Sequence, residues 1–227
     1  MNDTNVQDPP KLSRSITSRV YESMRADIIT GTLKPGKKLK IDELVKTYEA
    51  GNSPVREALS LLTSDALVER LDQRGFRVIP VSTAEFDELL KTRVWLEERA
   101  LTEAMKHGDT AWEEEIILLT YRLANTDRSL SADAFIANSA WEQHHKRFHQ
   151  ALIKACGSEI LLKFCDQLYD QNTRYRHLAG PTAYPTRDVN DEHAALSEAV
   201  LKRREKDALE LLRVHYQQTA HFLREHF

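Results

Sequence analysis

Apolar residues recur every three or four positions along most of the chain, and this spacing predicts a mainly α-helical protein. Three stretches near the N-terminus carry such a stripe and are predicted to be helices: 15–30, 41–48 and 53–65. Two short apolar runs follow at 66–71 and 75–79 and predict strands, because residues 72–75 between them have the composition of a hairpin turn. Three helices followed by a β-hairpin form a winged helix-turn-helix.

The helical spacing continues beyond this segment and predicts an all-α bundle of about six helices: 83–107, 110–126, 132–155, 158–177, 189–204 and 206–226. Ser82 or Thr83 is expected to cap the first helix, and Gly157 to separate the third from the fourth. We therefore expect four segments, of which the last is long enough to bury its own core: a disordered arm at 1–14, a winged helix-turn-helix domain at 15–80, a linker at 81–83 and an all-helical domain at 84–227.

The third predicted helix begins like a DNA-recognition helix. Ser53 is expected to cap it, with Pro54 at the first helical position, where its missing N–H has no helical partner to lose. A buried stripe then leaves Asn52, Ser53 and Arg56 exposed at the N-terminal end, which is the end that reads base edges in the major groove. Arg74, Gly75 and Arg77 in the hairpin are expected to reach adjacent phosphates or the minor groove. Taken alone, segment 53–65 fits an ordinary amphipathic helix equally well.

The overall charge does not indicate a nucleic-acid-binding protein, because 32 basic residues are outnumbered by 35 acidic ones. The distribution is uneven, however, since residues 1–80 hold 13 basic and 11 acidic residues. This small excess of positive charge lies on the segment that is proposed to contact DNA phosphates. The seven glycines and seven prolines favour long helices over a β-rich fold.

The remaining composition predicts a cytoplasmic protein with no membrane partner. No apolar run approaches membrane-spanning length, and the first residues have no signal pattern. Cys156 and Cys165 are therefore expected to be buried and reduced.

Four histidines have a spacing that suits a metal site. His145 and His149 are one turn apart on one predicted helix, and His193 and His215 lie on the fifth and sixth. Imidazoles that converge from three helices can hold a divalent metal inside a bundle. The alternative is that each is an ordinary core or surface histidine.

Three blocks of the first 80 residues resemble, in order and spacing, the GntR family of bacterial transcription regulators: Ile28–Gly36, Ser53–Leu59 and Arg74–Val78. The resemblance implies that Arg56 contacts DNA and that Gly75 is the wing glycine. Two features depart from the family: Asn52 stands where a base-reading arginine is common, and Glu49-Ala50-Gly51 replaces the usual Gly-Val-Ser. Since asparagine favours adenine over guanine, the operator is expected to differ from the common family sequence.

Residues 83–227 resemble the C-terminal ligand-binding domain of FadR, through motifs around Arg93, His149, His193 and His215, and look most like the CsiR branch. In metal-binding members, three matching histidines and an aspartate hold the ion. The aspartate position is His145 here, and an all-imidazole set would suit zinc or nickel. Glu142, one turn earlier, is an alternative source of a carboxylate.

The same resemblance implies a small organic acid effector beside the metal, held by an arginine fork. Arg93 is the first candidate because it lies on the apolar stripe of its helix, and Arg174 or Arg176 is the second. The alternative for the latter two is a surface ion pair.

These features predict a ligand-responsive regulator, a homodimer that binds a palindromic DNA operator and represses until a small carboxylate effector binds. Two rivals stay open: a metal-dependent hydrolase with an accessory winged helix, and a winged helix that binds only proteins. The hydrolase lacks a recognisable general base or nucleophile motif, so we predict that the chain is not an enzyme.

Overall fold

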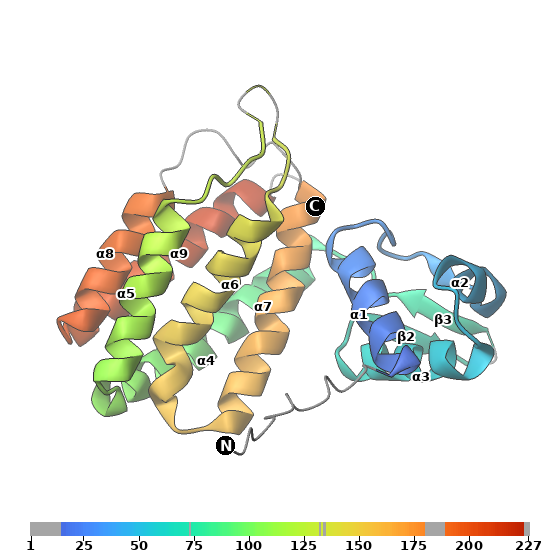
Figure 1. Ribbon diagram of the computed structural model, residues 1–227, viewed down its shortest axis with the longest axis horizontal. Helices are drawn as coiled ribbons and strands as arrows, with labels where there is room; N and C mark the ends of the chain where they lie inside the picture. Colours follow the sequence, from blue (N-terminus) through green and yellow to red (C-terminus); the bar gives the residue numbers. More distant parts are fainter. Residues whose placement is uncertain (1–14, 73, 132, 134, 180–188, 225–227) are drawn as a thin grey trace, which may run out of the picture. The chain divides into compact units, whose positions relative to one another are not determined.

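The computed structural model describes residues 15–224 except 73, 132, 134 and 180–188 (Figure 1). The predicted arm at 1–14 lies outside the described residues. Among the described residues, 15–28 and 32–79 form one compact unit, and 29–31 together with those from Pro80 onward form the other.

The first unit is a winged helix-turn-helix, as predicted from the sequence. Its elements follow in the order α1 (Ile16–Ile29), β1 (Lys38–Leu39), α2 (Ile41–Thr47), α3 (Asn52–Ser64), β2 (Val68–Leu71) and β3 (Gly75–Val78). The strands form an antiparallel sheet in the order β1-β3-β2, with Leu39 opposite Phe76 and Leu71 opposite Gly75. Gly75 has a φ of 88°, which only glycine adopts readily, so it closes the hairpin turn.

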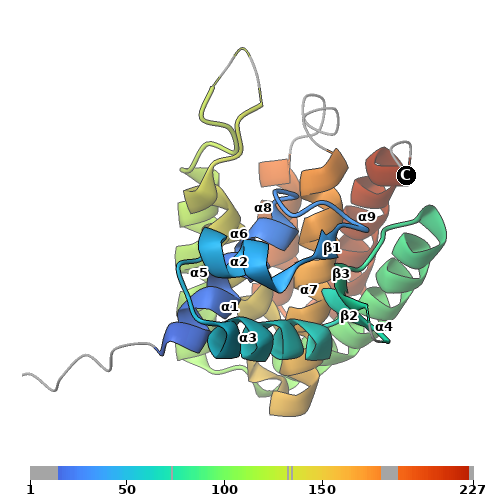
Figure 2. The same cartoon turned by 90° about the vertical axis from the view of Figure 1, so that its right-hand side faces the viewer.

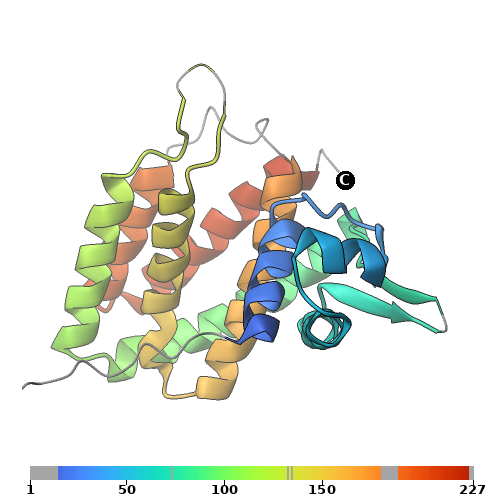
Figure 3. The ribbon, with the colours of Figure 1, turned by 45° about the vertical axis from the view of Figure 1, so that its right-hand side comes forward.

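The helices of this unit pack around one apolar core. The α3 stripe is fully buried, and it meets apolar residues of α1 and both hairpin strands: Val20, Met24, Ile28, Val55, Ala58, Leu59, Leu62, Val68 and Val78. Two phenols fix the helices further, since Tyr21 donates to Asp65 at 2.5 Å and Tyr48 to Asp27 at 2.6 Å. Figure 2 shows α3 lying across this unit below α2, and Figure 3, which views α3 along its axis, shows the hairpin projecting to one side.

The second unit is an all-helical bundle. Its elements are α4 (Thr83–His107), α5 (Thr110–Ala124), α6 (Ser139–Ile153), the short 3₁₀ turn η1 (Lys154–Cys156), α7 (Glu159–Ala179), α8 (Val189–Leu201) and α9 (Glu205–Arg224). Helix α4 crosses α6 and α7 obliquely and also packs on α9, which makes it the central helix of the unit (Figure 1). Within the described part of the chain, none of the helices is long and apolar enough to cross a membrane.

Capping side chains define where several of these helices begin. The Ser82 hydroxyl accepts from the Glu85 N–H at 3.2 Å and donates to its carboxylate at 3.0 Å, so Ser82 caps α4 as one of the two predicted candidates. Gly157 ends η1 in the left-handed region at φ 73°, as expected for the break between α6 and α7.

The predicted start of the third bundle helix at 132 was wrong, because α6 begins at Ser139. The polar side chains of this segment bond to its own backbone instead. Ser129 accepts from the Ile136 N–H at 3.0 Å, and Asn138 donates to the Asp127 carbonyl at 2.7 Å. Such local bonds compete with the helix, and Asn138 then caps α6 by accepting from the Ala140 N–H.

The predicted cap of α3 was also wrong. The helix begins one residue earlier than expected, at Asn52, with Gly51 at the N-cap and no side-chain cap bond. Ser53 and Pro54 therefore lie within the first turn. The sequence analysis also missed strand β1, whose two residues are too few to show an alternating pattern.

These two serines give a test of the helix caps. Replacing Ser82 with Ala should lower the unfolding free energy by about 1 kcal/mol, because α4 loses its capping oxygen. Ser53→Ala should leave the unfolding free energy unchanged, since Ser53 caps nothing. Urea unfolding followed by far-UV circular dichroism measures both effects, because each of the two units contains helices. Equal losses in the two variants would contradict this assignment of the caps.

Candidate functional site

Helix geometry brings the four predicted histidines together inside the second unit. His145 and His149 are one turn apart on the buried face of α6, while His193 projects from α8 and His215 from α9. All four side chains are buried, and one ligand atom of each lies within 4.8 Å of the others. The rings are too close for independent roles, so they form a single site, which we call the histidine cluster.

Three of these rings have a partner on the nitrogen that faces away from the cluster. His145 Nδ1 lies 2.6 Å from the Tyr169 hydroxyl, and His149 Nδ1 lies 3.2 Å from that of Tyr216. His215 Nδ1 lies 2.7 Å from the Glu192 carboxylate. Such partners orient an imidazole and fix which nitrogen carries its proton.

Burial keeps the two α6 imidazoles neutral. It holds the pKa of His145 well below the usual range, with a further contribution from the positive charge of Arg176. Burial also lowers the pKa of His149, helped by His215 and His193. Neutral imidazoles are the form that ligates metal, so both rings are in that form at neutral pH.

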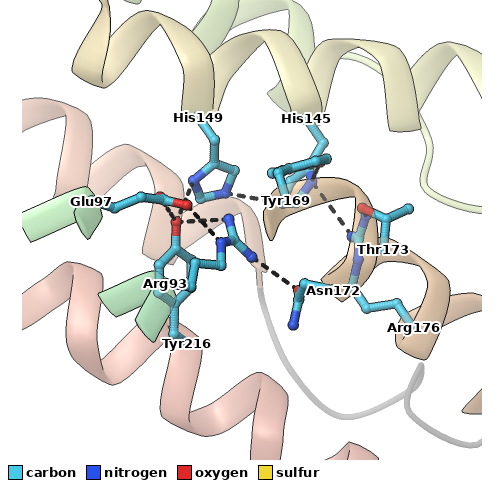
Figure 4. Close-up of polar contacts among 9 residues, drawn as sticks. All are labelled: Arg93, Glu97, His145, His149, Tyr169, Asn172, Thr173, Arg176 and Tyr216. Atoms are coloured by element: carbon cyan, nitrogen blue, oxygen red, sulfur yellow. Dashed lines mark hydrogen bonds and ion pairs between the residues drawn. The ribbon is translucent and has the colours of Figure 1, made fainter. Parts of the chain in front are cut away.

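A buried ion pair lies beside the cluster (Figure 4). Arg93 and Glu97 on α4 are joined at 2.6 Å, with side chains only 4% and 3% exposed. The guanidinium also donates to Asn172 at 2.9 Å and to the Tyr216 hydroxyl at 2.9 Å. Tyr216 donates to the other carboxylate oxygen of Glu97, so the pair is linked through one phenol to His149.

The two other predicted arginines lie in different places on α7. Arg176 is near the cluster, with Nη1 3.5 Å from His145 Nδ1 and Nη2 2.8 Å from Glu142. Arg174 is buried, and Tyr175 and Glu85 are among the groups that influence it. The expected alternative of a surface ion pair therefore does not describe Arg174.

A cavity of about 290 Å³ reaches the cluster between α6 and α7. Its lining includes His149, Glu97 and Tyr169, together with Cys165, which is buried and reduced as expected. None of the three predicted effector arginines is among the described residues that line it. The space next to the cluster thus opens beside His149 and beside Glu97, the carboxylate that pairs with Arg93.

The donor set of the cluster fits a divalent metal of the softer first-row type. Four imidazoles offer nitrogen ligands, and the Nδ1 contacts of His149 and His215 leave their other nitrogens for an ion. Glu142, the alternative carboxylate ligand, is instead paired with Arg176.

The DNA-binding residues predicted in the first unit are exposed. Asn52, Ser53 and Arg56 lie exposed on the first turns of α3, and Arg74 lies exposed at the hairpin turn. Arg77 differs, because its Nε lies 2.7 Å from Glu69 on the neighbouring strand. The structure thus gathers a polar, positively charged edge on the helix and turn.

Comparison with family models matches both units. Residues 16–78 match the bacterial regulatory proteins of the gntR family, and residues 88–218 match the FCD domain. The chain belongs to the GntR family of transcription regulators. Its C-terminal unit is an FCD domain, so the predicted family is confirmed, while the assignment to the CsiR branch stays a prediction.

Two relatives are similar to this GntR-family chain over most of its length. The chain is 38% identical to the uncharacterised HTH-type transcriptional regulator BphR of Paraburkholderia xenovorans (strain LB400), over 93% of this chain and 86% of the relative. It is 31% identical to the HTH-type transcriptional repressor GlaR of Escherichia coli (strain K12), over 86% of this chain and 90% of the relative. The fold also resembles the solved structure of E. coli McbR/YncC, with a TM-score of 0.75 at 21% identity, covering 94% and 99% of the two chains.

Sequence reasoning missed the phenols of this FCD domain. Tyr169 and Tyr216 contact the cluster directly, yet in the sequence they are single aromatic residues on apolar stripes. The position of Tyr216, directly after His215, was the one available signal.

The ion pair provides a test of the site's framework. Glu97→Gln should lower the unfolding free energy by about 3–5 kcal/mol, because it leaves the buried Arg93 charge uncompensated. Its neighbour gives a matched control: Glu98 pairs with Arg213 at the half-exposed surface, so Glu98→Gln should cost less than about 1 kcal/mol. Denaturant unfolding followed by tryptophan fluorescence compares the two, and similar losses would refute the central role of the pair.

Proposed function

We propose that this protein is a dimeric, cytoplasmic repressor that binds a palindromic DNA operator and is released by a small organic acid. One observation carries the proposal: a buried histidine cluster flanked by arginine–carboxylate pairs lies in the same chain as an exposed recognition helix. GntR regulators combine an operator-binding domain with an effector-binding domain, usually as dimers. Repression, rather than activation, is supported by the name of the relative GlaR, which is a transcriptional repressor.

In this proposal the operator is read by the first turns of α3. Asn52, Ser53 and Arg56 contact bases and phosphates, while Arg74 and Gly75 at the wing approach the neighbouring backbone. Arg77 contributes less than its charge suggests, because Glu69 neutralises it. Asn52 favours adenine at the position it reads.

The histidine cluster is proposed to hold zinc or nickel, which suit imidazole ligands. A bound ion would supply a positive charge and a coordination position for an effector carboxylate. The cavity that reaches His149 has room for a small acid beside the cluster.

Arg176 does not line this cavity, but of Arg93 and Arg176 it is the better placed to contact an acid that also reaches the His145 side of the cluster. Its guanidinium lies next to His145, and its partner Glu142 is 22% exposed, whereas Glu97 beside Arg93 is 3% exposed. An effector carboxylate exchanges more readily with the accessible partner than with the buried one. Arg93 acts in this proposal as a support of the site, and Arg174 stays outside it.

Effector binding is proposed to alter the spacing of the two recognition helices in the dimer. Coupling free energies between such sites are typically about 1–3 kcal/mol, which is enough to change operator affinity 5- to 150-fold.

The first test concerns DNA. Arg56→Ala should weaken binding to duplexes selected by the protein from a random-sequence library by roughly 10-fold or more, because one positioned guanidinium is lost. Lys163→Ala, which removes one exposed charge from α7, is the control and should bind as the wild type does. Fluorescence anisotropy at several salt concentrations measures both, and affinity should fall steeply with salt.

An unchanged affinity in Arg56→Ala would overturn the recognition-helix assignment. If that variant also showed metal-dependent hydrolysis at wild-type rates, the rival enzymatic function would be favoured instead.

The second test concerns the effector. A thermal-shift screen against small mono- and dicarboxylates should give at least one acid that raises the melting temperature, since ligands that bind only the folded state stabilise it. The shift should vanish after chelation if the acid binds at a metal. A shift that is indifferent to chelator would remove the metal from the proposal, and the absence of any shift would remove the carboxylate.

A further inference from the structure

A continuous chain of hydrogen bonds crosses the histidine cluster (Figure 4). It runs from Arg176 through His145, His149 and Tyr216 to Glu97, and Tyr169 joins it at His145. A guanidinium can only donate and an ionised carboxylate can only accept. The two ends therefore fix the direction in which every proton between them points.

The hydrogen bonds at Glu97 determine which ring nitrogen of His149 carries the proton. Glu97 accepts from Arg93 Nε at 2.6 Å and from the Tyr216 hydroxyl. Because Tyr216 has a single proton and gives it to Glu97, its oxygen must accept from its other neighbours. One is Arg93 Nη2 at 2.9 Å, and the other is His149 Nδ1 at 3.2 Å. His149 thus carries its proton on Nδ1 and has an electron pair on Nε2.

His145 must then have the opposite tautomer. Its Nε2 lies 3.2 Å from His149 Nε2, and since the latter offers an electron pair, His145 donates. Its Nδ1 is then the acceptor, with the Tyr169 hydroxyl at 2.6 Å and Arg176 Nη1 at 3.5 Å as donors. An imidazole has at least one ring proton, so with Nδ1 accepting from Arg176 the His145 proton is on Nε2, and the His149 Nε2 opposite it must accept.

The reverse direction is unfavourable at both ends. It would leave the oxygens of Tyr216 and Glu97 facing each other at hydrogen-bond distance without a proton between them. It would also turn the N–H of His145 toward the Arg176 guanidinium. A buried polar contact without its proton is strongly unfavourable, and more so where a charge is involved.

His215 carries a proton on Nδ1, as His149 does, whereas His145 carries its proton on Nε2. Its Nδ1 lies 2.7 Å from the Glu192 carboxylate, an acceptor, so Nδ1 of His215 carries a proton and only Nε2 is left for an ion. His149 and His215 thus have Nε2 as their ligating nitrogen, while His145 presents a proton from that atom.

We propose that the four histidines are not equivalent: His149, His193 and His215 are the metal-binding set, and His145 is a hydrogen-bond donor that caps the Nε2 atom of His149 as long as no ion takes that electron pair. His145 thus does not replace the aspartate ligand of metal-binding relatives. Ligation through its Nε2 would require its proton to move to Nδ1, against Tyr169 and Arg176. The position that His145 does not fill is then available to an effector carboxylate, and this part of the inference rests on the proposed function.

The tautomers can be measured directly in the wild-type protein. In chelator-treated protein with ¹⁵N-labelled histidine, long-range ¹H–¹⁵N correlation spectra distinguish protonated from unprotonated ring nitrogens. We expect His145 protonated on Nε2, and His149 and His215 protonated on Nδ1, with assignments from single His→Asn variants. His145 protonated on Nδ1 would overturn the proposal, whether or not the protein binds metal.

Metal affinity provides the second measurement. In zinc titrations by calorimetry, His145→Asn should keep its dissociation constant within about threefold of the wild type. His149→Asn and His215→Asn should weaken binding by more than about 100-fold, beyond the loss typical of a residue that only supports a ligand. Thermal unfolding with chelator present would confirm that each variant is folded.

Two results separate this inference from the proposed function. A loss in His145→Asn as large as that in His149→Asn would make His145 an equal ligand, which contradicts the inference while the metal site stands. If the wild-type protein bound no zinc or nickel, the proposed metal site would fail, and the tautomers alone would then decide whether the hydrogen-bond assignment is correct.

Discussion

The buried ion pair between Arg93 and Glu97 is the contact on which the sensing unit depends. Both groups are on α4, the helix that packs against α6, α7 and α9, and their side chains are almost fully buried. A buried ion pair is stable only if all of its hydrogen-bonding groups are satisfied. Asn172 and Tyr216 do this here, and so tie α4 to α7 and α9. The same contacts fix the proton of Tyr216 and, through it, the orientation of His149.

The charges around the histidine cluster are arranged in pairs. Arg93 is matched by Glu97 and Arg176 by Glu142, so neither arginine adds an uncompensated charge next to the imidazoles. Glu192 adds a carboxylate through His215. A metal ion held by neutral imidazoles keeps its full positive charge, which explains why an acidic effector would bind there more tightly than a neutral one.

The sequence predicted those features that depend on spacing within one helix. His145 and His149 were placed together because they are one turn apart, and Arg93 was placed inside because it lies on an apolar stripe. The joining of His193 and His215 to this pair was one of two alternatives until the family resemblance favoured it, since contacts between helices far apart in the chain have no local signal.

The contacts that the sequence did not reveal have the same physical origin. The contact between Arg77 and Glu69 depends on strand register, and those of Tyr169 and Tyr216 depend on packing between helices. Helix α6 starts late because Ser129 and Asn138 bond to the backbone, a choice that apolar spacing does not reveal.

The central claim is that the histidine cluster controls DNA binding. Its most direct test is operator affinity measured against increasing concentration of the stabilising acid, in wild-type protein and in His215→Asn, both loaded with zinc. The account predicts that the acid changes the wild-type affinity at least fivefold and leaves the variant unaffected, although the variant binds the same DNA. An equal response in both proteins would contradict the account, because the acid would then act through a site other than the cluster.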